Sequence, residues 1–326
     1  MTPGLLALLE DSIDYAGMFP PASLGLEEAV RNYCRYRGEP ESWMLGSFVC
    51  PIARLEELFP LVREEVRHHS TSEHQFRVTG LLAGGETLDA FLDSTRQEVQ
   101  FVTEGPLFSR VTTLEVRVPG EVVEHGDFRF LEDWLRVWIL GEAEPRMAYL
   151  ELPLDSRSVA SGGWPELIRR SASEIRRRER AQYHSSSYKV GIKLRTGGST
   201  LDLVPSSAVL ATAICGLRDE GLRWKATAGL HQPLRHFDSA VGAKVHGFVN
   251  LFVAVVMADV HRLPPAAVEA ILDDEDPTDF VFEGKAMRWR DLSASVPEIA
   301  CYKLLESFGS CSFDGPRDGL RKLGWL

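Results

Sequence analysis

Residues 190–198 read Val-Gly-Ile-Lys-Leu-Arg-Thr-Gly-Gly, and the prediction of the fold starts from them. The alternation of apolar residues is typical of a buried β-strand. Two cations, Lys193 and Arg195, nevertheless share one face of this strand, close to the glycines that end it. A buried strand with charges at its end requires a fold in which this face reaches water.

A second stretch has the same pattern. Residues 222–230 read Leu-Arg-Trp-Lys-Ala-Thr-Ala-Gly-Leu, which places Arg223, Lys225 and Thr227 on one face. Two strands with the same design indicate that they contribute to the same site.

The whole chain of 326 residues repeats one unit, a short β-like run followed by a longer amphipathic segment. Eight such runs occur, at 12–22, 42–51, 76–84, 111–120, 146–155, 188–198, 222–231 and 305–316. Strand followed by helix predicts parallel crossovers. Eight units are the number found in a (β/α)₈ TIM barrel, which is our predicted α/β fold, and a doubly wound open sheet is the alternative. We predict one barrel domain over 1–326, with an inserted elaboration at 262–297 before the last strand.

In a barrel, one face of each strand packs on helices and the other points inward. The predicted outward residues are aliphatic or aromatic: Ile192, Leu194, Trp224, Ala226, Leu114, Val116, Leu150 and Leu152. The predicted inward residues are charged or polar: Lys193, Arg195, Lys225, Thr227, Glu115, Arg117 and Glu151. Charges inside a barrel are tolerable near its mouth, at the carboxyl ends of the strands, where active sites are built. The sequence therefore predicts a site at this end.

Lysine and carboxylate side chains in one pocket indicate amine chemistry. A lysine with apolar walls and a second cation nearby is expected to have a lowered pKa. Its neutral amine attacks carbonyl groups and forms an imine, which withdraws electrons from the adjacent carbon. Glu115 or Glu151 is expected to move the protons. The alternative is a buried Lys–Glu–Arg network that only closes the barrel mouth.

The stretches Lys-Leu-Arg-Thr-Gly-Gly at 193–198 and Lys-Ala-Thr-Ala-Gly-Leu at 225–230 resemble the strands of the deoxyribose-phosphate aldolase family. That family consists of class I aldolases on a (β/α)₈ barrel. The resemblance implies that Lys193 forms the imine and that Lys225 lowers its pKa. It implies a loose match of Glu115 to the acid of that family, and it covers roughly residues 188–230.

The chain departs from that family at the groups expected to bind substrate. Arg195 stands where the family has a small residue, which favours an anionic substrate. The later phosphate-binding pieces are replaced by 229–236 and 309–316, which predict an anion-binding corner. The residues predicted to bind substrate are Arg195, Thr196, Arg117, Thr227, His231, Arg235, Ser310, Ser312 and Asp14.

Composition limits the remaining possibilities. The net charge of −11 argues against a nucleic-acid surface, and five scattered cysteines fit reduced thiols and a cytoplasmic location. The N-terminus lacks a signal-peptide pattern, and the longest apolar run is too short to span a bilayer, so no membrane is expected. We expect no cofactor and no metal, although ligation of a metal by Glu115, Glu151 and His231 stays open, as does a homo-oligomer.

The predicted function is that of a class I aldolase or lyase acting on a small anionic carbonyl compound. Two alternatives stay open. One is a metal-independent sugar or keto-acid isomerase or epimerase, with Lys193 or Glu151 abstracting a proton and Arg195 holding the enolate. The other is a non-catalytic barrel that binds a metabolite.

Overall fold

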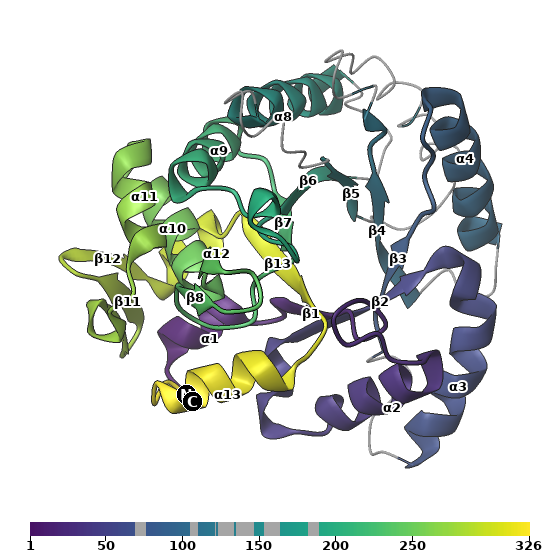
Figure 1. The fold of residues 1–326 in the computed structure, drawn as a ribbon, viewed down its shortest axis with the longest axis horizontal. Helices are drawn as coiled ribbons and strands as arrows, with labels where there is room; N and C mark the ends of the chain where they lie inside the picture. Colours follow the sequence, from purple (N-terminus) through teal and green to yellow (C-terminus); the bar gives the residue numbers. More distant parts are fainter. Residues whose placement is uncertain are drawn as a thin grey trace.

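The structure is a computed structural model that describes residues 1–68, 76–104, 110–120, 122, 134, 147–152, 164–181 and 189–326. Eight parallel strands close into a barrel in the order β1-β13-β7-β6-β5-β4-β3-β2 (Figure 1). They are β1 Ile13–Tyr15, β2 Leu45–Pro51, β3 Val78–Leu81, β4 Val111–Arg117, β5 Met147–Glu151, β6 Lys189–Arg195, β7 Trp224–Thr227 and β13 Leu305–Ser310. This confirms the predicted (β/α)₈ barrel. The open-sheet alternative is wrong, because β1 pairs with both β2 and β13.

Helices surround the barrel (Figure 1). Those described are α1 Pro3–Leu9, α2 Leu26–Arg37, α3 Leu55–His68, α4 Leu88–Glu104, α8 Trp164–Ala181, α9 Ser207–Glu220, α10 Phe248–Val260, α11 Pro265–Asp273, α12 Val296–Tyr302 and α13 Asp314–Lys322. Local signals set their ends: in α9 the Ser206 side chain caps the first turn, and Gly221 ends the helix at φ 61°. The amphipathic segment predicted to follow the run at 111–120, at 128–140, lies outside the described residues except for Trp134, which is buried.

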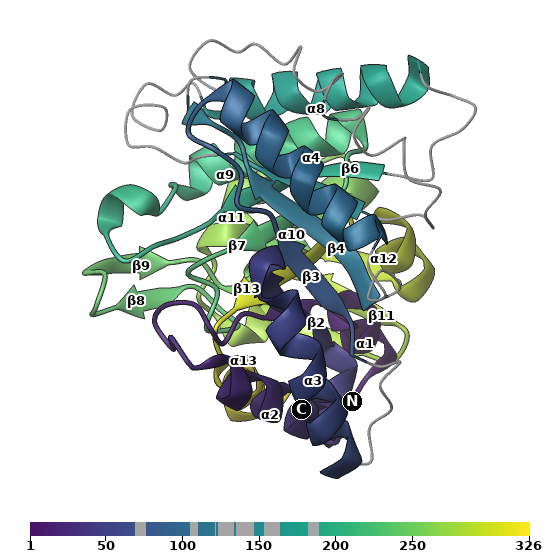
Figure 2. The ribbon, with the colours of Figure 1, turned by 90° about the vertical axis from the view of Figure 1, so that its right-hand side faces the viewer.

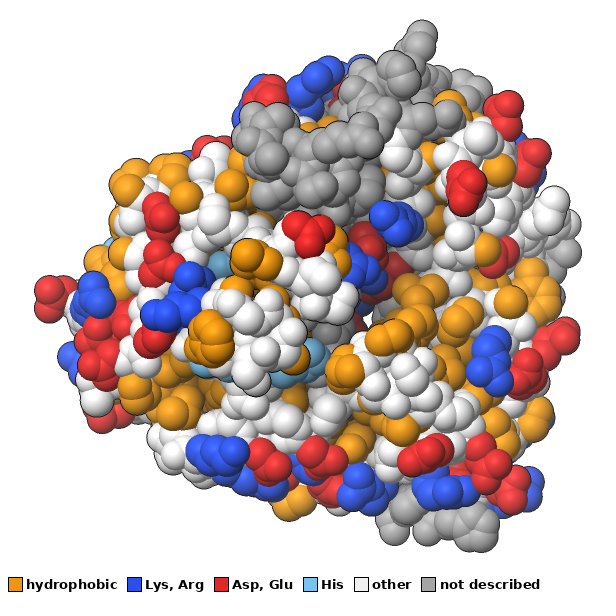
Figure 3. Space-filling view, in the orientation of Figure 1, with side chains coloured by type: hydrophobic (Ala, Val, Ile, Leu, Met, Phe, Trp, Pro, Cys, Tyr) orange, Lys and Arg blue, Asp and Glu red, His pale blue; other side chains and the backbone are white. Residues whose placement is uncertain are grey.

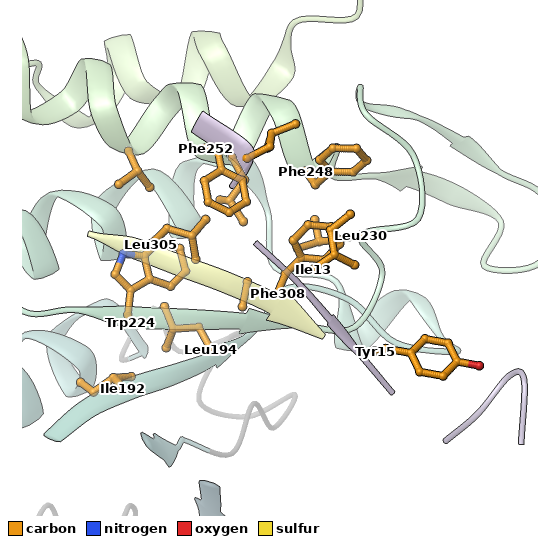
Figure 4. Packing of buried hydrophobic residues seen from close by; sticks show 14 of the residues in the cluster. Ile13, Tyr15, Ile192, Leu194, Trp224, Leu230, Phe248, Phe252, Leu305 and Phe308 are labelled. Carbon is orange, nitrogen blue, oxygen red and sulfur yellow. The ribbon is translucent and has the colours of Figure 1, made fainter. Parts of the chain in front are cut away.

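Hydrophobic side chains fill the layer between strands and helices, as the alternation predicts. Ile192, Leu194 and Trp224 are almost fully buried on the outer faces of β6 and β7. Figure 4 shows this layer at close range, with the ring of Phe308 beside that of Phe248. Their ring centroids lie 5.2 Å apart. Burial of large apolar side chains is the main favourable term in folding, so this layer holds the barrel together.

Helix α10 explains the position of the elaboration at 262–297. Eleven of its residues, from Phe248 to Ala258, are buried. A helix that is apolar all round must be covered on its outer side as well. The cover is α11, α12 and a three-stranded antiparallel sheet of β10 Phe280–Glu283, β11 Ala286–Trp289 and β12 Leu292–Ser295.

A second apolar segment, at Leu201–Glu220, packs as part of the barrel. Among the described residues, only the stretch Leu201–Glu220 is long and apolar enough to cross a membrane, judged by length and composition alone. It contains α9, which packs against α8 and α11 as one of the helices of the barrel. Its apolar character is therefore explained by the packing of that helix.

The two ends of the barrel differ. After β7 the chain forms a hairpin of β8 His236–Asp238 and β9 Ala243–Val245, which projects at the end where the strands terminate (Figure 2). Helix α12 lies toward the opposite end, where it leads into the start of β13. The end with the hairpin is the mouth, where barrel enzymes carry their active sites.

Candidate active site

The barrel interior contains a network of charged side chains. Lys193 Nζ on β6 lies 2.6 Å from Glu115 Oε2 on β4 and 2.9 Å from Glu151 Oε2 on β5. Lys225 Nζ on β7 contacts the other oxygen of Glu115 and lies 2.7 Å from Asp14 Oδ2 on β1. Glu115 therefore bridges the two lysines. We call these five residues the ionic network.

Strand pairing brings the network together. Lys193 is aligned with Lys225 on one side and with Glu151 on the other, so three neighbouring strands present these side chains next to one another. Inward residues recur every second position along each strand, which also directs Glu115 into the interior. The interior of this barrel is therefore charged where bulky aliphatic residues usually fill it.

Exposure in the network increases toward the mouth. The side chains of Lys225 and Glu115 are 3% and 4% exposed, whereas those of Lys193 and Glu151 reach 10% and 13%. Arg195, whose Nη2 lies 3.5 Å from Glu151, is 36% exposed. Figure 3 shows Lys or Arg and Asp or Glu side chains beside a hollow in the middle of this face. Lys193 is therefore the lysine nearer to the mouth.

Asp14 is fixed in place by groups from both neighbouring strands. It accepts hydrogen bonds from the Ser47 backbone N–H at 2.7 Å and from the Ser307 hydroxyl at 2.6 Å. A side chain at Gly46 would place its Cβ 2.5 Å from Asp14 Oδ1, so only glycine fits there. These contacts aim the Asp14 carboxylate at Lys225.

The charges in the network set the pKa values of its members. Burial raises the pKa of Glu115, but Lys193 and Lys225 outweigh it and hold the pKa at about 2. Burial lowers the pKa of both lysines, but their carboxylate partners outweigh it and the pKa of each is raised. Both amines are thus ammonium groups at neutral pH. The predicted lowering of the pKa of each lysine by the other is wrong here, because the Glu115 carboxylate lies between them.

The predicted substrate-binding residues of β4, β6 and β7 lie at the mouth. Arg117, the last residue of β4, is exposed and has no ion-pair partner among the described residues. Thr227 is half-buried at the end of β7. Thr196 is buried, and its hydroxyl donates to the carbonyl of Ala228 at 2.9 Å. Thr196 therefore fastens the ends of β6 and β7 to each other.

Two glycines allow this close approach of the β6 and β7 loops. A Cβ at Gly197 would lie 2.8 Å from the Cα of Gly229, which itself has φ +81°. Ala228 also has a positive φ, of 66°. The glycines that the aldolase resemblance contains are therefore needed here for backbone packing.

The predicted anion-binding corner has hydrogen-bond partners within its own loops. Arg235 Nη2 lies 3.3 Å from Asp273 Oδ1, at the end of α11. The Ser310 hydroxyl donates to the Ser312 carbonyl at 2.6 Å, and the Ser312 hydroxyl accepts from the Gly315 N–H at 3.2 Å. These three residues hold the loops after β7 and β13 in place, and within the described residues no hydrogen bond or ion pair joins them to the ionic network.

Within the described ranges, no three or more His, Cys, Asp or Glu side chains are grouped so that they could hold a metal ion. Glu115 and Glu151 direct their carboxylates to Lys193. His231 is half-buried, and its burial lowers the pKa of the imidazole.

Several residues around the ionic network were not predicted from the sequence. The Tyr149 hydroxyl donates to Glu306, which also accepts from Arg223, and the Tyr149 ring centroid lies 5.3 Å from Lys225 Nζ. Tyr149 lies two residues before Glu151, so the alternation that identified Glu151 could have identified it. Glu306 and Ser307 lie where the pairing of β13 with β7 shifts register, which breaks that alternation.

The fold and the interior define a (β/α)₈ barrel with two lysines joined through a shared buried carboxylate. No protein-family model matches the chain, and no curated protein matches it in sequence.

Proposed function

We propose that this barrel is a class I aldolase or lyase in which Lys193 forms an imine with a small anionic carbonyl compound. The supporting observation is the position of Lys193, close to the mouth and within 2.9 Å of two carboxylates. These two carboxylates would also stabilise a protonated imine, because it carries a single positive charge, as the Lys193 ammonium does.

Proton transfer would begin with Glu151. The Lys193 amine must lose a proton before it attacks a carbonyl carbon. Glu151 lies in contact with it and nearer the mouth than Glu115, whose pKa of about 2 makes it a weak base. After attack, Glu151 returns this proton to the oxygen and then relays a second proton from the nitrogen, so that the oxygen leaves as water and a protonated imine remains. When the bond from the neighbouring carbon to the next, hydroxyl-bearing carbon breaks, its electron pair passes to the iminium and gives an enamine. The hydroxyl gives its proton to the Glu151 carboxylate, and that fragment leaves as an aldehyde or ketone.

Lys225 would act as a positioning residue. The aldolase resemblance implies that the second lysine lowers the pKa of the first, but here Glu115 screens the two from each other. Lys225 instead holds Glu115 and Asp14 as carboxylates. Glu115 in turn keeps Lys193 in place and stabilises the positive charge of the imine.

The anionic group of the substrate would be bound by Arg117 and Arg195. Both end their strands at the mouth, and Arg117 has no carboxylate partner among the described residues. Guanidinium groups bind carboxylates and phosphates through paired hydrogen bonds.

We further propose that the protein acts in the cytoplasm, without a nucleic-acid partner, a membrane or a cofactor. A homo-oligomer is compatible with this function.

Reductive trapping tests the proposal. The protein is incubated with sodium borohydride and one of four compounds: pyruvate, glyoxylate, acetaldehyde or glyceraldehyde 3-phosphate. We expect at least one to add its reduced mass to a peptide containing Lys193. Lys193→Arg is expected to abolish the adduct, because a guanidinium forms no imine. An adduct that persists in this variant, or none with any compound, would overturn the proposal.

An isomerase or epimerase is the second candidate, favoured by the raised pKa of Lys193. A permanent ammonium cannot attack a carbonyl, but it can stabilise an enolate while Glu151 abstracts a proton. This function predicts exchange of substrate α-hydrogen with deuterium from solvent and no trapped adduct. A barrel that only binds a metabolite predicts neither result.

A further inference from the structure

A cavity of about 350 Å³ opens at the amino-terminal ends of the strands, away from the mouth. Its lining includes Arg77, Arg223 and Lys303, which directly precede or closely precede β3, β7 and β13. The volume lies at the lower end of the range for small-molecule sites, about 300–1,000 Å³. Lys193 and Glu151 do not line this cavity, so the proposed nucleophile and its base lie outside it, although Lys225 and Asp14 of the ionic network form part of its wall.

Most cations of the cavity are neutralised by a neighbour. Each of three forms an ion pair with a carboxylate that also lines the cavity: Arg77 with Asp11, Arg223 with Glu306, and Lys225 with Asp14. The fourth cation, Lys303, differs. Its Nζ donates to the backbone carbonyl of Glu10 at 3.2 Å, and no carboxylate of the described chain lies within 4.0 Å of it.

The environment of Lys303 is costly for a charged group. The side chain is half-buried, and the ring of Phe252, whose centroid lies 5.9 Å from the ammonium, gives only a weak cation–π attraction and no counter-charge. Burial lowers the pKa of Lys303 even though nearby acids, among them Glu10, oppose the shift. A half-buried ammonium without a carboxylate in direct contact is destabilising, and an anion bound beside it would reduce this cost.

We infer that the cavity at the amino-terminal end binds a small anion with a carboxylate or phosphate group, and that Lys303 is its charged partner. Thr113 on β4 also lines the cavity, and its hydroxyl has no hydrogen-bond partner among the described residues. It supplies a second donor. The inference does not depend on imine chemistry at the mouth.

Isothermal titration calorimetry tests the inference, with acetate, malonate, succinate and inorganic phosphate, none of which can form an imine, as separate titrants at low ionic strength. We expect at least one to bind with a stoichiometry of one and to bind at least tenfold more weakly to Lys303→Met. Lys193→Met is expected to bind it unchanged, which separates this cavity from the mouth. Lys322→Met, on the exposed end of α13, is the matched lysine control.

A second readout follows from linkage. An anion beside Lys303 raises the pKa of its amine, so binding above neutral pH takes up protons, and the apparent heat then depends on the buffer. Lys303→Met is expected to remove this dependence.

If Lys303→Met does not fold, Lys303→Arg and Lys303→Gln give the same comparison, and binding should be kept only in Lys303→Arg. Absence of binding by all four anions, equal binding by the neutral variant, or loss of binding in Lys193→Met would overturn the inference.

Discussion

Glu115→Gln is expected to lower the free energy of unfolding by about 3–5 kcal/mol, because it leaves Lys193 and Lys225 without their shared counter-charge inside the barrel. Chemical denaturation at neutral pH measures the change. Glu283→Gln, on the exposed edge of β10, is the matched control and should stay within about 0.5 kcal/mol of wild type. A loss under about 1 kcal/mol for Glu115→Gln would mean that the two ammonium groups do not depend on this carboxylate.

The contribution of Glu115 to the free energy of unfolding is expected to depend on pH. The pKa of Glu115 is lowered to about 2 in the folded chain, against about 4.3 for an unfolded glutamate. Its contribution to stability is therefore complete above about pH 4.3 and is lost as the pH falls toward 2. Wild type should lose more stability over this interval than Glu115→Gln. Equal losses would contradict the assignment.

Lys193→Met is expected to lower the rate of carbon–carbon cleavage by at least ~10³-fold, because it removes the proposed nucleophile. Its effect on stability should be modest, about 1–3 kcal/mol. The reason is that Glu115 keeps its contact with Lys225, and Glu151 keeps Arg195 nearby. Steady-state kinetics of cleavage of the aldol that the best-trapping carbonyl compound forms with a second aldehyde, together with chemical denaturation, measure both effects.

Lys193→Arg separates catalysis from charge balance. It keeps a cation beside Glu115 and Glu151, so the barrel should stay as stable as in Lys193→Met or become more so. It cannot form an imine, so cleavage should fall as far as in Lys193→Met. If Lys193→Arg retains cleavage within tenfold of wild type, a cation suffices and Lys193 is not a nucleophile.

The sequence was sufficient to predict the barrel and the charged side chains that meet in its interior, but not Tyr149, Glu306 and Ser307 around them. Alternation along β4 to β7 assigned Glu115, Glu151, Lys193 and Lys225 to the interior, because the two-residue period of a strand leaves few options. Asp14 was expected near the mouth, and the structure places it deeper, against Lys225. That depth depends on how β1 pairs with β2 and β13, and such pairing has no local signal in the sequence.

The direction in which the pKa values of the two lysines shift could not be predicted from the sequence. Two lysines on adjacent strands are expected to repel each other when considered alone, which lowers both pKa values. Whether a carboxylate lies between them depends on how a third strand, β4, is placed around the barrel. The contacts within the loops after β7 and β13 could not be predicted either. Arg235, Ser310 and Ser312 form an ion pair and hydrogen bonds with residues that come close only when the loops are folded.

The central claim is that Lys193 and Lys225 are ammonium groups held by one carboxylate, and NMR of ¹⁵N-labelled lysine side chains tests it most directly. At about pH 9.5, one unit below the ordinary lysine pKa, we expect two slowly exchanging ammonium signals. One should vanish in Lys193→Met and the other in Lys225→Met, and both should shift in Glu115→Gln. If either lysine loses its proton below that pH, or neither signal responds to Glu115→Gln, the claim is contradicted.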